Sequence, residues 1–343
     1  MTTLPLIGFW KHWGSNEGEV LKLIRIEHFN ASTIAETVSL LGKDAGKSKI
    51  IAGGTDLVAM IKNRLIAPEV VVNMKTIPGL AQIKDDAEGL KTGALTKIID
   101  IETSPIVRSK YPMLAEAAYS VASPQIRNMG TIGGNLCQDV RCWYYRMPPV
   151  TGTTFFCYRK GGKTCPSVVG DNRNEAIIGG KRCFAICPSD MAPVLVALDA
   201  RLKIVGAEGE RVVPVAEFYI IMGNILKPDE IITEIQVPTP EPGTRQRFIK
   251  FRIRKTIDFA LSSVAAVITV KGGVISRSRI VLGGVAPIPY RATEAEDVLQ
   301  GKRITETLAE TAAKAALSKA KPLSMNRYKV PLTEALVKRA IAS

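Results

Sequence analysis

The sequence predicts an α+β protein with more than one domain, and three observations lead to this prediction. A buried strand, a glycine turn and a helix follow one another in "KSKIIAGGTDLVAMIKNRL" (residues 47–65). The segment "SSVAAVITVKGGVISRSRIVLGGVA" (262–286) alternates in the manner of an antiparallel meander. Amphipathic helical patterns then follow in "ATEAEDVLQGK" and "ITETLAETAAKAALSKA" (292–320).

The elements can be assigned in chain order. A capped helix at 31–43 precedes the strand and glycine turn, and "PEVVVNMKTI" (68–77) adds a second buried strand. Short strands follow from about residue 80, with a helix at 111–122 and a helix and strands over 190–238. The polar stretch "TPEPGTRQR" (239–247) carries two prolines and is typical of a linker before the meander.

The composition limits the classes of function that the chain can have. The 343 residues are 46% hydrophobic, without a run of about 20 apolar residues or a secretory signal, so we expect a cytoplasmic protein with no membrane span. The net charge of +14 indicates an acidic partner, but recognition motifs for nucleic acid are absent. His12 and His28 are the only histidines, so we expect no catalytic side chain and a bound cofactor instead.

Two glycine turns could hold that cofactor. "AGGTD" (52–56) lacks the dinucleotide-binding and P-loop patterns, but glycines before a helix let backbone N–H groups approach a diphosphate. "TIGGN" (131–135) repeats the device about 80 residues later. Packing alone explains one such turn equally well, whereas two could grip an extended diphosphate from both sides.

Five motifs occur in the order and approximate spacing typical of one protein family. "IIAGGTDLVAMIK", "SPQIRNMGTIGGNLC", "PSDMAPVLVALDA", "DEIITEIQVP" and "VLGGVAPIPYRATEAEDVLQG" resemble those of the FAD-binding subunits of molybdenum hydroxylases, over about residues 22–340. The resemblance implies a two-part FAD-binding domain of the vanillyl-alcohol-oxidase (PCMH) type and a C-terminal antiparallel sheet with helices. It divides the chain into an arm (1–21), FAD-binding subdomains at 22–80 and 81–240, and a flavoprotein domain at 246–343.

The same resemblance implies the cofactor contacts. The first turn would hold the diphosphate, the second would clamp it, Asp190 would bond the cofactor, and Ile232 and Lys250 would lie near the flavin. The residues of the two turns are Ile50, Ile51, Ala52, Gly53, Gly54, Thr55, Asp56 and Leu57, and Thr131, Gly133, Gly134 and Asn135. The three residues outside the turns each also have a purely structural alternative: Ile232 as a core residue, Asp190 as a helix cap and Lys250 as a solvated strand residue.

All six cysteines lie between residues 137 and 187. In a reducing cytoplasm such clustering favours a metal site over disulfides. Spacing alone leaves zinc, through Cys137 with Cys142 and Cys183 with Cys187, level with an iron–sulfur cluster.

About 40 of these residues form an insertion relative to most of the family, at about 138–187. Through "GGNLCQDVRCWYYR" and "RKGGKTC", the insertion resembles the 4Fe-4S loop in the β subunit of 4-hydroxybenzoyl-CoA reductases. That match implies 4Fe-4S ligation by Cys142, Cys157, Cys165 and Cys183, with Cys137 and Cys187 outside the ligand set. Because the loop between Cys165 and Cys183 is longer than the match leads us to expect, the choice between Cys183 and Cys187 as the fourth ligand is open.

From residue 141 to 182 the insertion holds eight Lys or Arg against Asp171 and Glu175, which is +6 of the net charge. A basic surface of this kind would attract an acidic one-electron carrier such as a ferredoxin. The resemblance then implies an electron-transfer subunit, with a molybdopterin-binding large subunit and a 2Fe-2S small subunit in a dimer of heterotrimers. The alternatives are a flavin subunit that uses NAD or oxygen with a zinc-bound loop, and a basic scaffold that binds nucleic acid.

Overall fold

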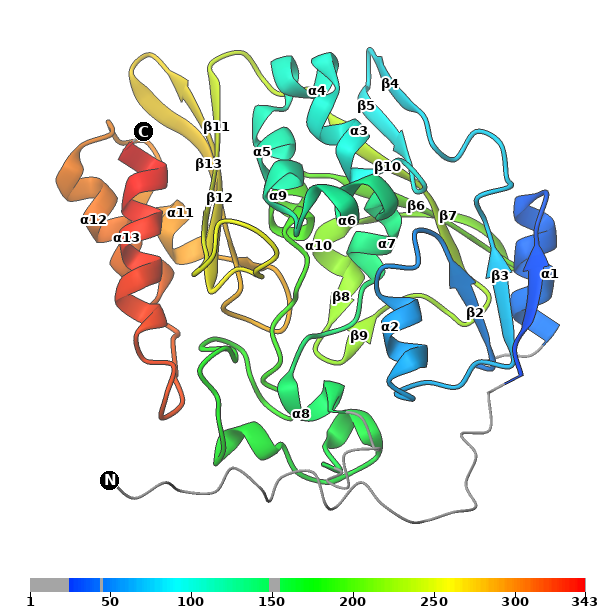
Figure 1. The fold of residues 1–343 in the computed structure, drawn as a ribbon. Coiled ribbons are helices and arrows are strands. Elements are labelled where there is room, and N and C mark those ends of the chain that lie inside the picture. Colours follow the sequence, from blue (N-terminus) through cyan, green and yellow to red (C-terminus); the bar gives the residue numbers. More distant parts are fainter. Residues whose placement is uncertain (1–24, 44–45, 148–154, 343) are drawn as a thin grey trace, which may run out of the picture.

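The computed structural model describes residues 25–43, 46–147 and 155–342, and Figure 1 shows three sheets side by side with helices between and around them. The predicted N-terminal arm (1–21) lies outside the described residues. The observed mixture of sheets and helices agrees with the predicted α+β class. Within the described part of the chain, no helix is both long enough and apolar enough to span a membrane.

The first sheet is small and parallel. Its strand order is β1 (Glu27–Asn30), β3 (Val70–Asn73) and β2 (Ser48–Ile51), with helix α1 (Ile34–Lys43) after β1 and α2 (Leu57–Lys62) after β2. The central strand β3 is buried along its whole length, which explains its unbroken apolar run "VVV". Parallel pairing brings the C-terminal end of β2, where the first glycine turn begins, to one edge of the sheet.

The second sheet has five antiparallel strands in the order β4-β5-β10-β6-β7. Their bounds are β4 (Ile83–Asp86), β5 (Gly89–Gly93), β10 (Ile231–Pro238), β6 (Arg201–Gly206) and β7 (Gly209–Pro214). Short helices that follow β5 and precede β6 in the chain pack beside this sheet. They are α3 (Ile98–Thr103), α4 (Pro105–Lys110), α5 (Pro112–Ser120), α6 (Pro124–Met129), α7 (Ile132–Cys137) and α9 (Met191–Ala197). The second glycine turn lies where α6 passes into α7. A turn of helix, α10 (Val215–Phe218), and a hairpin, β8 (Tyr219–Ile220) and β9 (Gly223–Asn224), lie between β7 and β10.

The third sheet is the predicted meander. Its strands are β11 (Thr244–Phe251), β12 (Ser262–Lys271), β13 (Val274–Gly283) and β14 (Tyr290–Arg291). Alternate residues of β12 enter two different cores: Val264 and Ala266 pack toward the C-terminal helices, and Ala265 packs toward the core of the second sheet. Both faces are therefore buried, between α5 and α9 on one side and α11 (Thr293–Leu299), α12 (Glu306–Ala316) and α13 (Lys329–Ala342) on the other (Figure 1).

The cysteine-bearing insertion lies at one end of the molecule and contains the short helices α8 (Trp143–Arg146), η2 (Tyr158–Lys160) and η3 (Pro166–Val168) (Figure 1). Polar side chains fasten it to the C-terminal region. Fully buried Lys329 donates hydrogen bonds to the carbonyls of Asn174 (2.8 Å), Glu175 (3.2 Å) and Gly284 (2.8 Å). Because all three acceptors are backbone carbonyls, these hydrogen bonds fix the course of the main chain of the insertion rather than the position of a side chain.

Candidate functional site

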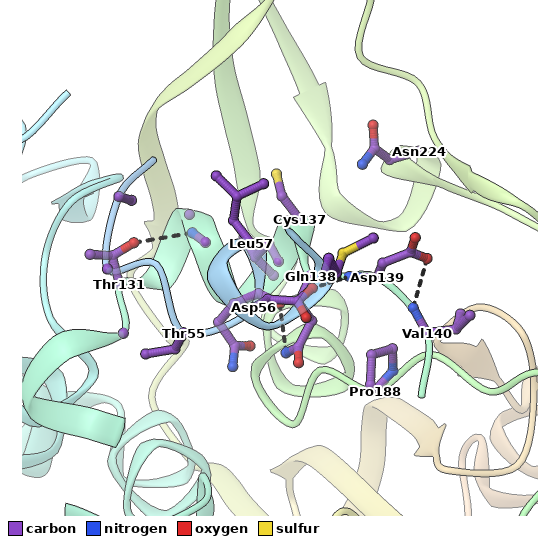
Figure 2. A pocket seen from close by; sticks show the side chains of 18 of the residues that line it. Thr55, Asp56, Leu57, Thr131, Cys137, Gln138, Asp139, Val140, Pro188 and Asn224 are labelled. Carbon is purple, nitrogen blue, oxygen red and sulfur yellow. Dashed lines mark hydrogen bonds between the residues drawn. The ribbon is translucent and has the colours of Figure 1, made fainter. Parts of the chain in front are cut away.

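A cavity of about 780 Å³ lies where the first two sheets meet the insertion and the connection between β11 and β12. Its wall includes the first glycine turn, the second glycine turn, the start of α9 and the start of β10. Figure 2 shows side chains from several of these segments around one space. The volume lies in the upper part of the range of about 300–1,000 Å³ that small-molecule sites occupy.

The two glycine turns pack directly against each other. A Cβ atom on Gly53 would lie 2.0 Å from the carbonyl oxygen of Met129 and 2.7 Å from its carbon. Gly130 faces the first turn as well, because a Cβ there would lie 3.5 Å from the Thr55 hydroxyl. The turns therefore form one backbone surface, and glycine is required where they touch.

Hydrogen bonds fix the conformation of the second glycine turn at the start of α7. The Thr131 hydroxyl accepts a hydrogen bond from the amide of Gly134 at 3.2 Å, which caps the helix (Figure 2). The amide of Gly133 donates to the carbonyl of Ala94 at 2.9 Å, and a Cβ on Gly133 would lie 2.9 Å from that same oxygen. Close packing on β5 thus fixes this turn beside the first.

The cavity wall brings together residues that the sequence places far apart. Of the predicted cofactor contacts, all but Ile51 and Lys250 belong to the described lining. Those in the lining are Ile50, Ala52, Gly53, Gly54, Thr55, Asp56, Leu57, Thr131, Gly133, Gly134, Asn135, Asp190 and Ile232. Ile232 is almost completely buried and also belongs to the large core.

Lys250 acts on the cavity through Asp190. Its ammonium lies 2.6 Å from the Asp190 carboxylate and donates to the carbonyl of Ser120 at 3.0 Å. Both ionic side chains are less than a tenth exposed. Burial raises the pKa of Asp190, and the lysine charge opposes that rise. The cavity wall at the start of α9 therefore depends on a buried ion pair.

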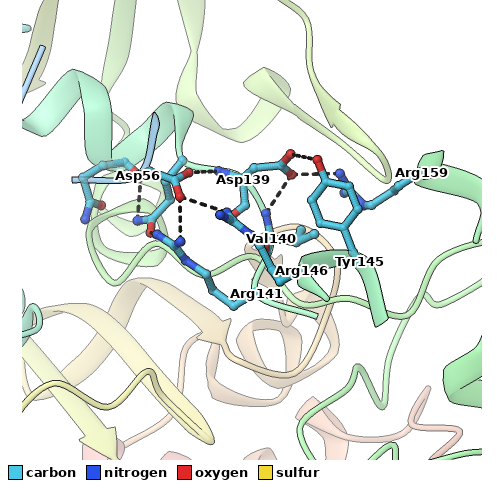
Figure 3. Close-up of polar contacts among 9 residues, drawn as sticks. Asp56, Asp139, Val140, Arg141, Tyr145, Arg146 and Arg159 are labelled. Atoms are coloured by element: carbon cyan, nitrogen blue, oxygen red, sulfur yellow. Dashed lines mark hydrogen bonds and ion pairs between the residues drawn. The ribbon is translucent and has the colours of Figure 1, made fainter. Parts of the chain in front are cut away.

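Asp56 is bound by the insertion. Its Oδ1 atom lies 2.6 Å from Nη1 of Arg141 and 2.9 Å from Nη2 of Arg146, and its Oδ2 accepts the amide of Asp139 at 2.8 Å (Figure 3). Because these contacts occupy both oxygens, the Asp56 side chain links the first glycine turn to the insertion. The sequence did not indicate this use of Asp56, and the arginines entered the prediction only as net charge.

The network continues to a cysteine. Asp139 accepts hydrogen bonds from Tyr145 (2.6 Å) and Arg159 (2.9 Å) (Figure 3). Nε of Arg159 donates to the sulfur of Cys183 at 3.4 Å. A chain of polar contacts thus runs from the first glycine turn to the thiols. Sequence reasoning missed Asp139, Tyr145 and Arg159 as members of this network, because the contacts join residues without any periodic spacing.

Three of the four predicted cluster ligands belong to one apolar cluster, but their side chains are not grouped as a metal site among the described residues. Cys142, Cys157 and Cys183 lie in one small apolar cluster, whereas the thiol of Cys165 lies 2.9 Å from the Ser167 hydroxyl. Among the described residues, no three His, Cys, Asp or Glu side chains are grouped as a metal site. The four-thiolate set is therefore not assembled among the described residues: the sulfur of Cys183 accepts a hydrogen bond from Arg159, and the thiol of Cys165 contacts Ser167.

The cysteines of the zinc alternative are separated as well. Cys187 belongs to the large core and Cys137 lines the cavity (Figure 2), whereas Cys142 and Cys183 lie in the apolar cluster. Burial raises the pKa of the Cys187 thiol to about 12, so it remains protonated near neutral pH, whereas Cys137 is an exposed residue of the cavity wall.

Comparison with known proteins decides the family. The family described as "FAD binding domain in molybdopterin dehydrogenase" matches residues 24–152 and 161–240, and "CO dehydrogenase flavoprotein C-terminal domain" matches 247–343. The chain belongs to the FAD-binding subunits of the molybdenum hydroxylase family. Its fold is accordingly the PCMH-type FAD-binding domain followed by the flavoprotein C-terminal domain of that family.

Individual relatives of this FAD-binding subunit cover nearly its whole length. The carbon monoxide dehydrogenase medium chain of Hydrogenophaga pseudoflava is 30% identical, over 92% of this chain and 96% of the relative. The aldehyde oxidoreductase FAD-binding subunit PaoB of Escherichia coli is 34% identical, over 86% and 90%. A crystal structure of carbon monoxide dehydrogenase from H. pseudoflava superimposes with a TM-score of 0.75 over 92% of this chain and 96% of that chain, at 30% identity.

The described residues fit FAD on structural grounds. Both glycine turns belong to the cavity wall, and Gly53 and Gly54 leave the first turn without side chains there. Nε of Arg141, in the cavity wall, is buried without a hydrogen-bond partner in the described residues. Ile232 and Leu226 add apolar surface to the same lining, which a flavin ring could contact.

Proposed function

We propose that this chain is the electron-transfer flavoprotein of a molybdenum hydroxylase complex, in which substrate chemistry takes place on a partner subunit. The observation that carries the proposal is the cavity at the joined glycine turns, in a chain that belongs to this family. Bound FAD accepts two electrons and can release them singly, which suits exchange with one-electron centres. The chain's residues bind and orient the cofactor; none is assigned a catalytic step.

The partners follow from the relatives. Solved relatives include a Cu,Mo-carbon monoxide dehydrogenase, and a subunit of the 6-hydroxypseudooxynicotine dehydrogenase complex of Paenarthrobacter nicotinovorans is 28% identical. We infer a molybdopterin-binding large subunit and a 2Fe-2S small subunit, as a dimer of heterotrimers in the cytoplasm.

Purification of the complex from its native host through a tag on this chain tests the assignment. We expect two further subunits, with molybdenum, iron and FAD in constant ratio to this chain across the elution peak. Isolation of this chain with FAD but without molybdenum or other subunits would contradict the assignment to such a complex.

Within this function, we propose that the insertion binds a 4Fe-4S cluster through Cys142, Cys157, Cys165 and Cys183. Three of these thiols lie in one apolar cluster, and four cysteine sulfurs are the ligand set that such clusters use. Arg159, beside Cys183, would stabilise the negative charge of a four-thiolate cluster. The subunit would then resemble that of 4-hydroxybenzoyl-CoA reductases and exchange electrons with a ferredoxin.

Analysis of iron, sulfide and zinc in the anaerobically purified chain tests the cluster. We expect about four irons and four sulfides per chain, reduced by more than half in Cys142→Ser. Cys137→Ser is the matched control, because Cys137 lines the cavity, and it should retain the iron. Stoichiometric zinc, or an iron-free chain that still binds FAD, would contradict the cluster and favour a flavin subunit that uses NAD or oxygen.

A further inference from the structure

The charges beside the two glycine turns do not balance. Arg141, Arg146 and Arg159 surround only two carboxylates, those of Asp56 and Asp139 (Figure 3). Asp56 is shared, since the same oxygen accepts one nitrogen from Arg141 and one from Arg146. One positive charge is therefore left over at the edge of the cavity that borders the first glycine turn.

Arg141 is the member of this pair that faces the cavity. It belongs to the described lining, whereas Arg146 does not. Nη1 of Arg141 contacts Asp56, and Nη2 contacts the Gln138 side chain at 3.1 Å. Nε of Arg141 is buried without a partner among the described residues. A buried N–H group without an acceptor is costly, and an anionic ligand would remove that cost.

The position of Arg141 is fixed from a third side. Its guanidinium lies 5.2 Å from the ring centre of Phe259, in the connection between β11 and β12. Burial and the nearby charge of Arg146 lower the pKa of Arg141. Aromatic and polar contacts thus hold the guanidinium of Arg141 in place. The single carboxylate of Asp56 does not neutralise the charges of both Arg141 and Arg146.

The other charged groups of the lining leave little competition. Every carboxylate in the described lining already has a cationic partner: Asp56, Asp139, Asp190, Glu230 and Asp258. Of the lining cations besides Arg141, Arg159 is committed to Asp139 and Cys183, and Lys49 is an exposed residue of β2. An anion entering beside the glycine turns therefore meets positive charge chiefly at Arg141.

We propose that Arg141 binds the diphosphate of FAD, so that the insertion supplies the positive charge that the two glycine turns lack. This inference rests on the proposed function of the chain as an FAD-binding subunit. In it, Asp56 orients Arg141 and does not itself contact the diphosphate. The residue that begins the insertion's charged segment would then serve the flavin site, whether or not the insertion holds a cluster.

Binding titrations on the flavin-free full-length chain test the proposal, with FAD, ADP and riboflavin as probes. Arg141→Gln should weaken FAD and ADP by the same factor, about 10-fold to 100-fold, because a charge-assisted contact to the diphosphate is lost. Riboflavin, which has no phosphate, should bind within about twofold of wild type. Arg146→Gln is the matched control: it removes the other partner of Asp56 but lies outside the described lining, so it should change FAD binding less than about threefold.

Two further variants keep the test decisive. Arg141→Lys retains the positive charge but lacks the two-armed geometry of the guanidinium. The binding of FAD and ADP should therefore be weakened several-fold less than in Arg141→Gln. This variant still tests the role of Arg141 if Arg141→Gln folds poorly. Lys49→Gln should leave FAD binding close to wild type. Equal losses in the Arg141 and Arg146 variants, a parallel loss of riboflavin, or a loss confined to Lys49→Gln would overturn the role of Arg141. Failure of the wild-type chain to bind FAD would instead overturn the proposed function.

Discussion

Gly53→Ala should abolish stable FAD binding, with a loss of affinity of at least about 100-fold. The added methyl group would lie 2.0 Å from the carbonyl oxygen of Met129, and both atoms belong to main chain or Cβ positions that cannot rotate away. The two glycine turns must therefore separate. Overpacking of this kind typically also costs about 1–3 kcal/mol of unfolding free energy. Flavin content of the purified variant and its thermal unfolding measure both effects.

Gly42→Ala is the matched control. Gly42 lies near the end of α1, where a Cβ atom would meet nothing within 4 Å. Alanine favours a helix over glycine by up to about 1 kcal/mol, so this variant should be as stable as wild type or slightly more stable, with full FAD content. A Gly53→Ala protein with wild-type flavin content would show that the contact between the turns is not needed for the site.

Lys250→Met should destabilise the protein by about 3–5 kcal/mol, because it leaves the buried Asp190 carboxylate without its counter-charge. The lysine side chain is 3% exposed and that of Asp190 is 7% exposed, so water cannot replace the lost ammonium. The double variant Asp190→Asn with Lys250→Met should recover much of the loss. Chemical denaturation of wild type, both single variants and the double variant gives the coupling energy.

The sign of the pH dependence follows from Asp190. Its pKa is already raised by burial in the wild type and would rise further without Lys250. A carboxyl group whose pKa is raised on folding costs stability as pH rises from its unfolded pKa to its folded pKa. The deficit of Lys250→Met should therefore be smaller near pH 5 than near pH 8. Lys271→Met, which breaks an exposed pair with Glu241, should leave stability almost unchanged at either pH, because solvent screens that pair.

The parts of the fold that follow local patterns could be predicted from the sequence. The alternation in residues 262–286 predicts an antiparallel meander, and β12 and β13 form it. The helix expected at 31–43 corresponds to α1, and the two glycine turns were expected to act together. These features depend on side-chain periodicity and turn chemistry, which the sequence displays directly.

The polar contacts that define the site could not be predicted in the same way. Asp56 meets Arg141 85 positions later, and Asp190 meets Lys250 60 positions later. Lysine is ordinarily a surface residue, yet Lys329 is fully buried because three backbone carbonyls surround its ammonium. Such contacts depend on how the insertion and the third sheet fold back on the first two sheets, and no local pattern records that arrangement.

The flavin content of the purified full-length chain tests the central claim most directly. We expect a yellow protein that releases about one FAD per chain on acid denaturation, and a flavin-free form that rebinds FAD more tightly than riboflavin because both glycine turns and Arg141 contact the diphosphate. A chain that purifies folded but colourless and does not rebind FAD would show that the cavity at the glycine turns is not a flavin site.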